Sequence, residues 1–289
     1  MAIPSATVKS VTASLYEWAL KKIPEDTKVA LAGAEHRERN PLGRATLTIM
    51  LKSAHAAETK GGLVCTDVGV PTYSVKIGTR VSFDGPVRRA IVEGFDDLVT
   101  RIQPPILCMV TDPLTNQRNF KGKDMPLATF DVIDDADYVE IVCSPKALGT
   151  GRWETIDTFV SPTLAQIEKF VVESVVRAGS QPCPPIVVGV GIGGTFDYAA
   201  KMAKEATLRP FGEVNPDATL AAMEKRLLEA INKTGFGPMG TGGDATAMAV
   251  HANYAAGHGY TPVAVCFNCW INRRTRARIH ADGRVERIE

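Results

Sequence analysis

A run of apolar, β-branched residues enclosed by prolines and glycines limits the folds open to this chain. Residues 186–190 read Ile-Val-Val-Gly-Val, which predicts a buried strand. Glycines continue to Gly194, and the spacing of the apolar residues that follow predicts a helix over Phe196–Leu208. A buried strand that leads through a glycine turn into a helix is typical of the α/β class.

Hydrophobic periodicity in the rest of the chain agrees with this class. The predicted helices are Val8–Lys21, Asp26–His36, Ala45–Thr59, Val87–Arg101, Ser161–Ala178 with Pro162 just inside its start, Asp217–Thr234 and Ala245–Tyr254. The predicted strands are Tyr73–Ile77, Pro104–Val110, Asp137–Val142, Pro184–Val190 and Thr261–Phe267, with a hairpin turn at Asp282-Gly283. We find no repeat or linker, and therefore expect one compact domain over residues 1–289, with a helical amino terminus and mixed sheets flanked by helices.

Composition narrows the classes of function. The 289 residues carry a formal net charge of +1, which provides no global field to draw the chain onto nucleic acid or a membrane. The longest apolar stretches are only strand-length, and the amino terminus shows no signal-peptide pattern. We therefore expect a soluble, cytoplasmic protein that uses neither nucleic acid nor membrane.

Six cysteines are too few for a disulfide scaffold in a chain of this length. Cys65, Cys183 and Cys269 fall at junctions beside glycine, proline or polar residues, where a thiolate could face a cavity. Cys108 and Cys143 lie inside apolar runs and are interpreted as core residues. From spacing alone, the three junction cysteines are either metal ligands or small fillers, because distant single cysteines form no metal signature.

Two further motifs also leave alternatives open. The glycines of residues 189–194 approach a G-x-G-x-x-G pattern, but the second strand with an acidic end that a dinucleotide-binding unit needs is missing about twenty residues on. The run is then a tight structural turn, or a turn that faces a carboxylate or a cluster. His251 follows a glycine-rich loop over 235–243 and is either a satisfied structural group or a functional one.

Taken in order, these segments resemble the α subunit, or amino-terminal region, of class I fumarases and L-tartrate dehydratases. The resemblance covers almost the whole chain. It is carried by Cys65-Thr66-Asp67-Val68-Gly69, Asp112-Pro113-Leu114-Thr115, Pro145-Lys146, the highly specific block from Cys183-Pro184-Pro185 to Gly193-Gly194, Leu208-Arg209-Pro210-Phe211-Gly212, Gly235-Phe236-Gly237-Pro238-Met239-Gly240, His251, and Cys269-Trp270 with Arg273-Arg274.

The resemblance implies an Fe-S hydro-lyase α-type catalytic domain with a 4Fe-4S cluster on Cys65, Cys183 and Cys269. One iron would stay open as a Lewis acid toward a small dicarboxylic acid, fumarate/malate-like or tartrate-like. The implied catalytic residues are Asp67 and His251, and the implied substrate-binding residues are Thr66, Arg101, Lys146 and Gly149. The proton-abstracting group would come from a β subunit, in a homodimer or an α2β2 assembly.

Departures from the family pattern lie near the expected substrate. Thr66 and Val68 replace the usual glutamine and threonine, and the substrate loop reads Ala-Leu-Gly-Thr-Gly-Arg-Trp-Glu over 147–154. These changes predict an unusual acid, bulkier or differently substituted than fumarate. They also motivate the alternative of a cluster-binding or assembly homologue with altered catalysis, and a nicotinamide-dependent dehydrogenase is the third hypothesis.

Overall fold

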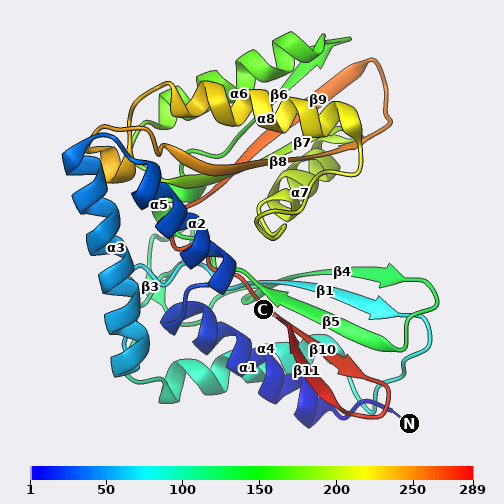
Figure 1. Ribbon diagram of the computed structural model, residues 1–289. Coiled ribbons are helices and arrows are strands. Elements are labelled where there is room, and N and C mark those ends of the chain that lie inside the picture. The colour runs from blue at the N-terminus through cyan, green and yellow to red at the C-terminus, as the bar shows by residue number, and fades with distance from the viewer. Residues whose placement is uncertain (1, 289) are drawn as a thin grey trace. The chain divides into compact units, whose positions relative to one another are not determined.

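The computed structural model describes residues 2–288, which form two compact units (Figure 1). The first unit runs up to Pro24, from Ala54 to Ala147 and from Arg273 onward, and the second contains Glu25–Ser53 and Leu148–Asn272. Each unit has its own sheet and its own hydrophobic core. The expected mixed α/β fold with a helical amino terminus is confirmed, whereas the single-domain assignment stays a prediction.

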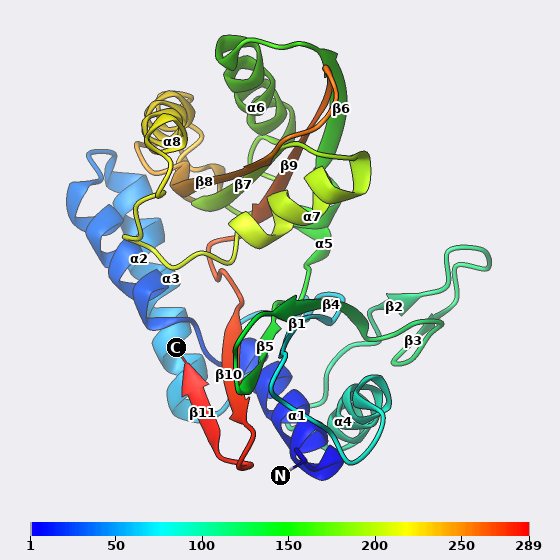
Figure 2. The ribbon, with the colours of Figure 1, turned by 90° about the vertical axis from the view of Figure 1, so that its right-hand side faces the viewer.

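In the first unit, two helices cover one face of a five-stranded sheet (Figures 1 and 2). The helices are α1 (Ser5–Lys21) and α4 (Val87–Arg101), and the strand order is β11 (Val285–Ile288), β10 (Thr275–His280), β5 (Tyr138–Cys143), β1 (Thr72–Gly78) and β4 (Leu127–Ile133). Only β1 and β4 are parallel. The two helices approach closely because Gly94 has no side chain, and a Cβ there would lie 2.4 Å from the Lys9 carbonyl oxygen. A small hairpin, β2 (Val110–Thr111) and β3 (Arg118–Asn119), completes this unit.

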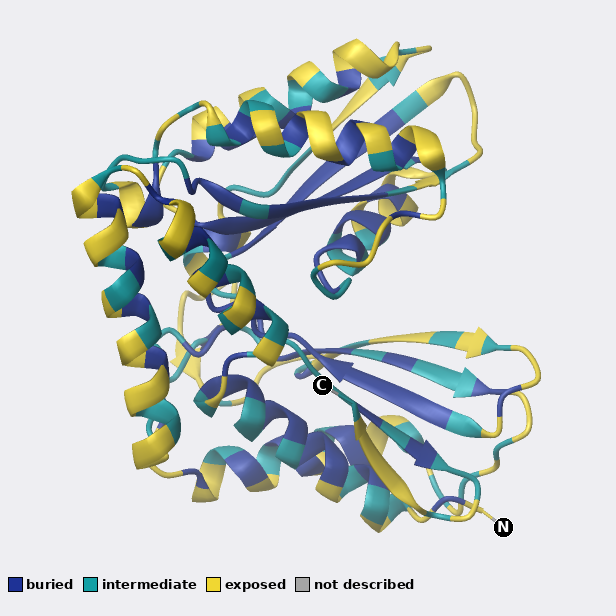
Figure 3. Ribbon diagram, viewed as in Figure 1, coloured by how far each residue is buried: buried dark blue, intermediate teal, exposed yellow. Residues whose placement is uncertain are grey.

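The second unit is a three-layer arrangement around a four-stranded sheet, and Figure 3 shows its central strands buried. The strand order is β6 (Thr155–Val160), β9 (Tyr260–Asn268), β7 (Ile186–Gly193) and β8 (Ala247–Ala255). Helices α6 (Leu164–Ala178) and α8 (Ala218–Asn232) lie on one face and α7 (Phe196–Ala206) on the other (Figure 2). The remaining elements are α2 (Glu25–Arg37), the first part of α3 (Pro41–Lys60), α5 (Leu148–Gly151) and the short helix η1 (Pro238–Gly240).

The glycine run is explained by the packing of α7 on β7. A Cβ at Gly189 would lie 2.0 Å from the carbonyl oxygen of Ala203, and one at Gly191 would lie 2.0 Å from that of Ala199. Two bare positions on the same face of the strand therefore let the helix backbone rest directly on the sheet. Gly193 and Gly194, with φ of 80° and 65°, form the turn into α7. This agrees with the tight structural turn considered above.

Three predicted elements differ from the structure. Only Val110 of Pro104–Val110 enters a strand, because Pro104 and Pro105 have no N–H to donate to a ladder. Helix α6 begins at Leu164 and not at Ser161, because Thr163 and Gln166 form a reciprocal capping box. The predicted helix over Ala245–Tyr254 is wrong, because this segment is strand β8, paired in parallel with β7.

Candidate functional site

The first unit holds Cys65, Thr66 and Asp67 in a loop between α3 and β1. Cys65 and Asp67 are half-buried and Thr66 is exposed. The Asp67 carboxylate accepts a hydrogen bond of 3.0 Å from the Gly69 N–H, which closes a local turn. The loop therefore presents a thiol and a carboxylate two residues apart, with the carboxylate oriented by its own backbone.

Lys146 is brought to the same loop by a backbone pairing. The Val70 N–H donates to the Lys146 carbonyl over 2.7 Å, and the Lys146 N–H donates back over 2.8 Å. Gly69 has φ 71°, and a Cβ there would lie 2.8 Å from the Lys146 carbonyl carbon, so only glycine fits this close approach. The backbone of Lys146 thus lies beside the carboxyl-terminal end of the Asp67 loop, within the first unit.

Arg101 ends α4, and its guanidinium lies 3.7 Å from Glu17 in an exposed ion pair on α1. Hydrogen bonds join the 65–70 loop to Lys146 and to Arg273 in the same unit. The role of Arg101 as a carboxylate clamp therefore gains no support from its surroundings and stays a prediction.

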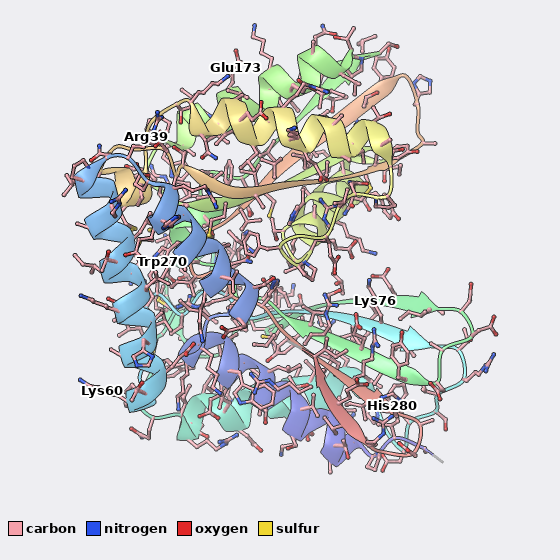
Figure 4. All side chains as sticks on the ribbon, in the orientation of Figure 1. Arg39, Lys60, Lys76, Glu173, Trp270 and His280 are labelled. Carbon is pink, nitrogen blue, oxygen red and sulfur yellow. The ribbon has the colours of Figure 1, made fainter. Side chains whose placement is uncertain are left out.

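The second unit brings Cys183 and Cys269 together at the end of its sheet where β7 begins and β9 finishes. The Trp270 N–H donates to the Cys183 carbonyl over 3.2 Å, which holds the two cysteine segments side by side. Both thiols are half-buried, whereas Trp270, labelled in Figure 4, is buried. Cys183 has φ 57°, an unusual backbone conformation for a residue with a side chain. Such strain is common at sites where function dictates side-chain direction.

Gly149 lies near this cysteine pair. It belongs to the one-turn helix α5, and a Cβ there would lie 2.9 Å from the carbonyl oxygen of Gln181, two residues before Cys183. The predicted substrate loop and the Cys183 turn are therefore in backbone contact, and an added side chain at residue 149 would separate them.

His251 is on β8, directly opposite Gly189 of β7. Gly189 is two residues along β7 from Val187, which pairs with Asn268 at the end of β9. His251 therefore lies about 7 Å along the sheet from the end of β9. The ring is 4% exposed, and its Nδ1 lies 3.1 Å from the carbonyl oxygen of Ala206. Because a carbonyl only accepts, Nδ1 carries the proton in this hydrogen bond.

A buried carboxylate fixes the segment beside His251. Glu224 accepts hydrogen bonds from Arg209 (2.6 Å), from the side-chain amide of Asn215 (2.7 Å) and from the Ala252 N–H (2.7 Å). The loop between α7 and α8 is thereby tied to β8, and Phe211 of this loop lies 6.4 Å from the His251 ring, centroid to centroid. Sequence reasoning did not identify Glu224, because nothing in a helical pattern distinguishes a buried glutamate from a surface one.

The glycine-rich loop that precedes β8 is organised by Glu38, which is 1% exposed. Its carboxylate accepts from the backbone N–H groups of Asn40, Asp244 and Ala245 over distances of 2.9 to 3.0 Å. Gly243 leaves the necessary space, since a Cβ there would lie 2.6 Å from a Glu38 carboxylate oxygen.

Glu38→Gln is expected to lower the free energy of unfolding by about 2–3 kcal/mol, because the amide NH2 would face backbone donors and leave buried N–H groups unpaired. Urea denaturation measures this loss. The control is Glu173→Ala at an exposed position of α6 (Figure 4), where Glu173 forms a surface ion pair with Lys169 and a change within ~0.5 kcal/mol is expected. Equal midpoints for the two variants would contradict the role of Glu38.

The other cysteines have different surroundings. Cys143 is fully buried, as predicted, whereas Cys108 is only half-buried. The Cys266 thiol is buried on β9 and donates to the Glu154 carboxylate over 2.8 Å. None of the six cysteines forms a disulfide within residues 2–288. This leaves Cys65, Cys108, Cys183 and Cys269 as half-buried thiols at loop positions, and the sequence resemblance distinguishes Cys65, Cys183 and Cys269 among them.

Cys183 and Cys269 are suited to be two of the ligands of an iron–sulfur cluster. Cys183 and Cys269 are half-buried thiols on adjacent backbone segments at one end of the sheet, and thiolates are the ligands that such clusters use. The described residues contain no ready group of three or more His, Cys, Asp or Glu side chains for a metal ion. Cys65 belongs to the first unit, so its membership in the ligand set rests on the sequence resemblance.

Comparison with known proteins agrees with that resemblance. Residues 9–278 match the family model described as fumarate hydratase (Fumerase). The chain is 36% identical over 286 residues to a Methanocaldococcus jannaschii protein provisionally named L(+)-tartrate dehydratase subunit alpha, over 96% of this chain and 99% of that protein. It is 29% identical over 274 residues to the L(+)-tartrate dehydratase subunit alpha of Escherichia coli K12, over 92% of this chain and 89% of that protein. No helix within residues 2–288 is long and apolar enough to cross a membrane.

Proposed function

Because this chain belongs to the fumarate hydratase (Fumerase) family of hydro-lyases, we propose that it is the α subunit of a cytoplasmic iron–sulfur hydro-lyase. The enzyme would reversibly add water to, or remove it from, a small dicarboxylic acid of the fumarate/malate or tartrate type. The single observation that carries the proposal is the pairing of Cys183 with the Cys269–Trp270 segment, in a chain that matches the family over residues 9–278.

Cys65, Cys183 and Cys269 would hold a 4Fe-4S cluster. When bound, a cluster with only three cysteine ligands supplies an open iron that acts as a Lewis acid on the substrate hydroxyl and its neighbouring carboxylate. The fit of the cysteine pair supports this ligand set, because its thiols are half-buried and sit at loop ends. The buried Cys266, bonded to Glu154, is not assigned to it.

The remaining side chains would bind and orient the substrate. Lys146, whose backbone pairs with Val70 beside the Asp67 loop, would supply a positive charge suited to a substrate carboxylate. His251, with its proton on Nδ1, is held ready by Ala206 and Phe211. Asp67 is kept in one orientation by the Gly69 N–H. Thr66, Arg101 and Gly149 are proposed as further substrate-binding residues.

A separate β subunit would complete the active site. The relatives are named as subunit alpha, which supports a second type of chain in their assemblies. We propose that the β subunit contributes the proton-abstracting group, and that the α chain forms a homodimer or an α2β2 complex. Light scattering of the α chain with and without the β chain measures this stoichiometry.

Anaerobic reconstitution of the α chain with iron and sulfide tests the cluster. We expect the absorbance of a 4Fe-4S cluster and, after mild oxidation, the EPR signal of a 3Fe-4S form, because an iron without a cysteine ligand is lost first. Absence of any cluster in the wild-type chain would show that the three cysteines are structural.

Adding the β chain and assaying fumarate hydration, malate dehydration and tartrate dehydration then tests the reaction. Turnover of one of these acids, or of a bulkier analogue, supports the hydro-lyase. A full cluster without turnover of any of them would favour the cluster-binding or assembly homologue with altered catalysis, which the changed residues 147–154 motivate.

A further inference from the structure

Arg273 connects two backbone positions of the loop that holds Cys65 and Asp67. Its Nη1 donates to the Asp67 carbonyl over 2.5 Å, and its Nη2 donates to the Cys65 carbonyl over 3.3 Å. One planar guanidinium therefore spans the segment on both sides of Thr66. All of these residues lie in the first unit.

The guanidinium is buried in an unusual way. Arg273 is 4% exposed, its Nε has no hydrogen-bond partner among the described residues, and its bonds within the first unit are to two carbonyls. Burying a cation without a carboxylate is costly. The two hydrogen bonds to the loop carbonyls are therefore the interactions that offset this cost.

The backbone of Arg273 is itself anchored. Its carbonyl accepts from the Ser144 hydroxyl over 2.9 Å, and the Ser144 N–H donates to the Thr72 carbonyl over 3.0 Å. The guanidinium therefore projects from a position fixed on the sheet. The carboxyl-terminal end of the loop is held separately, by the Val70–Lys146 pairing, and its amino-terminal side by the backbone bond from Val64 to Leu20. Arg273 adds a side-chain restraint on the half with the thiol.

We propose that Arg273 is a positioning residue that sets the direction of the Cys65 thiol and the Asp67 carboxylate by clamping the two carbonyls around Thr66. The inference deepens the proposed function, on which it rests for the roles of Cys65 and Asp67. A lysine would reach one carbonyl at a time, because its ammonium lacks the planar fork of arginine.

The test measures the alkylation rate of each cysteine in the iron-free chain by isotope-coded iodoacetamide and mass spectrometry. In Arg273→Met we expect Cys65 to react about tenfold faster than in the wild type, because losing charged hydrogen bonds lets the loop open more often. In Arg273→Lys we expect a smaller rise, of about threefold. The control is Arg80→Met, which removes an exposed first-unit arginine paired with Asp135 and should leave the rate unchanged.

Cys143 and Cys183 serve as internal references, the first for unfolding of the first unit and the second for the other unit. If Cys143 also becomes reactive in Arg273→Met, the first unit has unfolded in that variant. The Cys65 alkylation rate is then judged in Arg273→Lys, which keeps the buried charge. A Cys65 rate within twofold of wild type in the variant that keeps Cys143 protected would overturn the proposal.

A second readout uses the reconstituted protein. Transfer of iron to a ferrous chelator should be several-fold faster from Arg273→Met than from Arg80→Met, with Arg273→Lys between them. Because alkylation needs no cluster, a wild-type chain that binds no iron but still shows the Cys65 effect would refute the proposed function and leave the positioning role intact. A normal cluster with unchanged alkylation and iron release would refute only the positioning role.

Discussion

Cys183→Ala is expected to abolish the cluster and to reduce hydro-lyase activity by ~100-fold or more. Loss of groups that merely orient a metal ligand already costs about 10–100-fold, and here a proposed ligand itself is removed. Alanine keeps the Cβ of Cys183, so the backbone strain at φ 57° changes little. The fold should therefore persist. Iron and sulfide content, EPR and turnover with the β chain measure the effect.

The matched control is Cys266→Ala. Cys266 lies on β9 opposite Gly189, close in the sheet to the Cys183 turn, but its buried thiol donates to Glu154. Its loss should cost about 1 kcal/mol of stability and leave the cluster and the turnover number within twofold of wild type. If Cys183→Ala kept a full cluster, or if Cys266→Ala lost it, the proposed ligand set would be wrong.

Gly189→Ala is expected to lower the free energy of unfolding by about 3 kcal/mol or more. The new methyl group would lie 2.0 Å from the Ala203 carbonyl oxygen and 2.6 Å from Cγ2 of Thr207. The Ala203 backbone and the buried Thr207 side chain cannot shift enough to make space for the methyl group. Helix α7 must therefore move off the sheet. Urea denaturation followed by circular dichroism measures the loss.

A control for glycine replacement itself is Gly33→Ala in α2. There the new Cβ meets only the flexible end of Arg37, at 3.2 Å, and alanine favours a helix over glycine by about 0.5–1 kcal/mol. This variant should be neutral or slightly more stable. Equal stabilities for Gly189→Ala and Gly33→Ala would contradict the packing explanation of the glycine run.

Local pattern was sufficient for most of the fold. Val87–Arg101 is a helix with the predicted bounds, and Asp217 caps the helix that its position predicts. Both signals act within a few residues, through periodicity and capping. The same range of interaction explains why the Cys183 turn and the strand after it could be predicted, since proline, glycine and β-branched residues restrict the backbone directly.

Longer-range pairing decided the segments where prediction was wrong. Ala247–Ala255 is rich in alanine and follows a glycine loop, which favours a helix by propensity, yet it forms β8 because β7 offers a parallel partner along its whole length. Conversely, Pro104–Pro105 is apolar enough for a strand but lacks the donors that a partner strand would need.

Residue types in their order along the chain were enough to predict the class of the fold, the family and the candidate cysteines. Only the tertiary structure revealed the supports of the site: the Glu38 carboxylate on residues 244 and 245, and the Arg273 guanidinium on Cys65 and Asp67. Each joins positions more than two hundred residues apart, and a single sequence has no signal for such a contact. Their physical basis is burial, because a buried polar group without a hydrogen bond costs free energy and most such groups are therefore paired wherever the fold brings a partner.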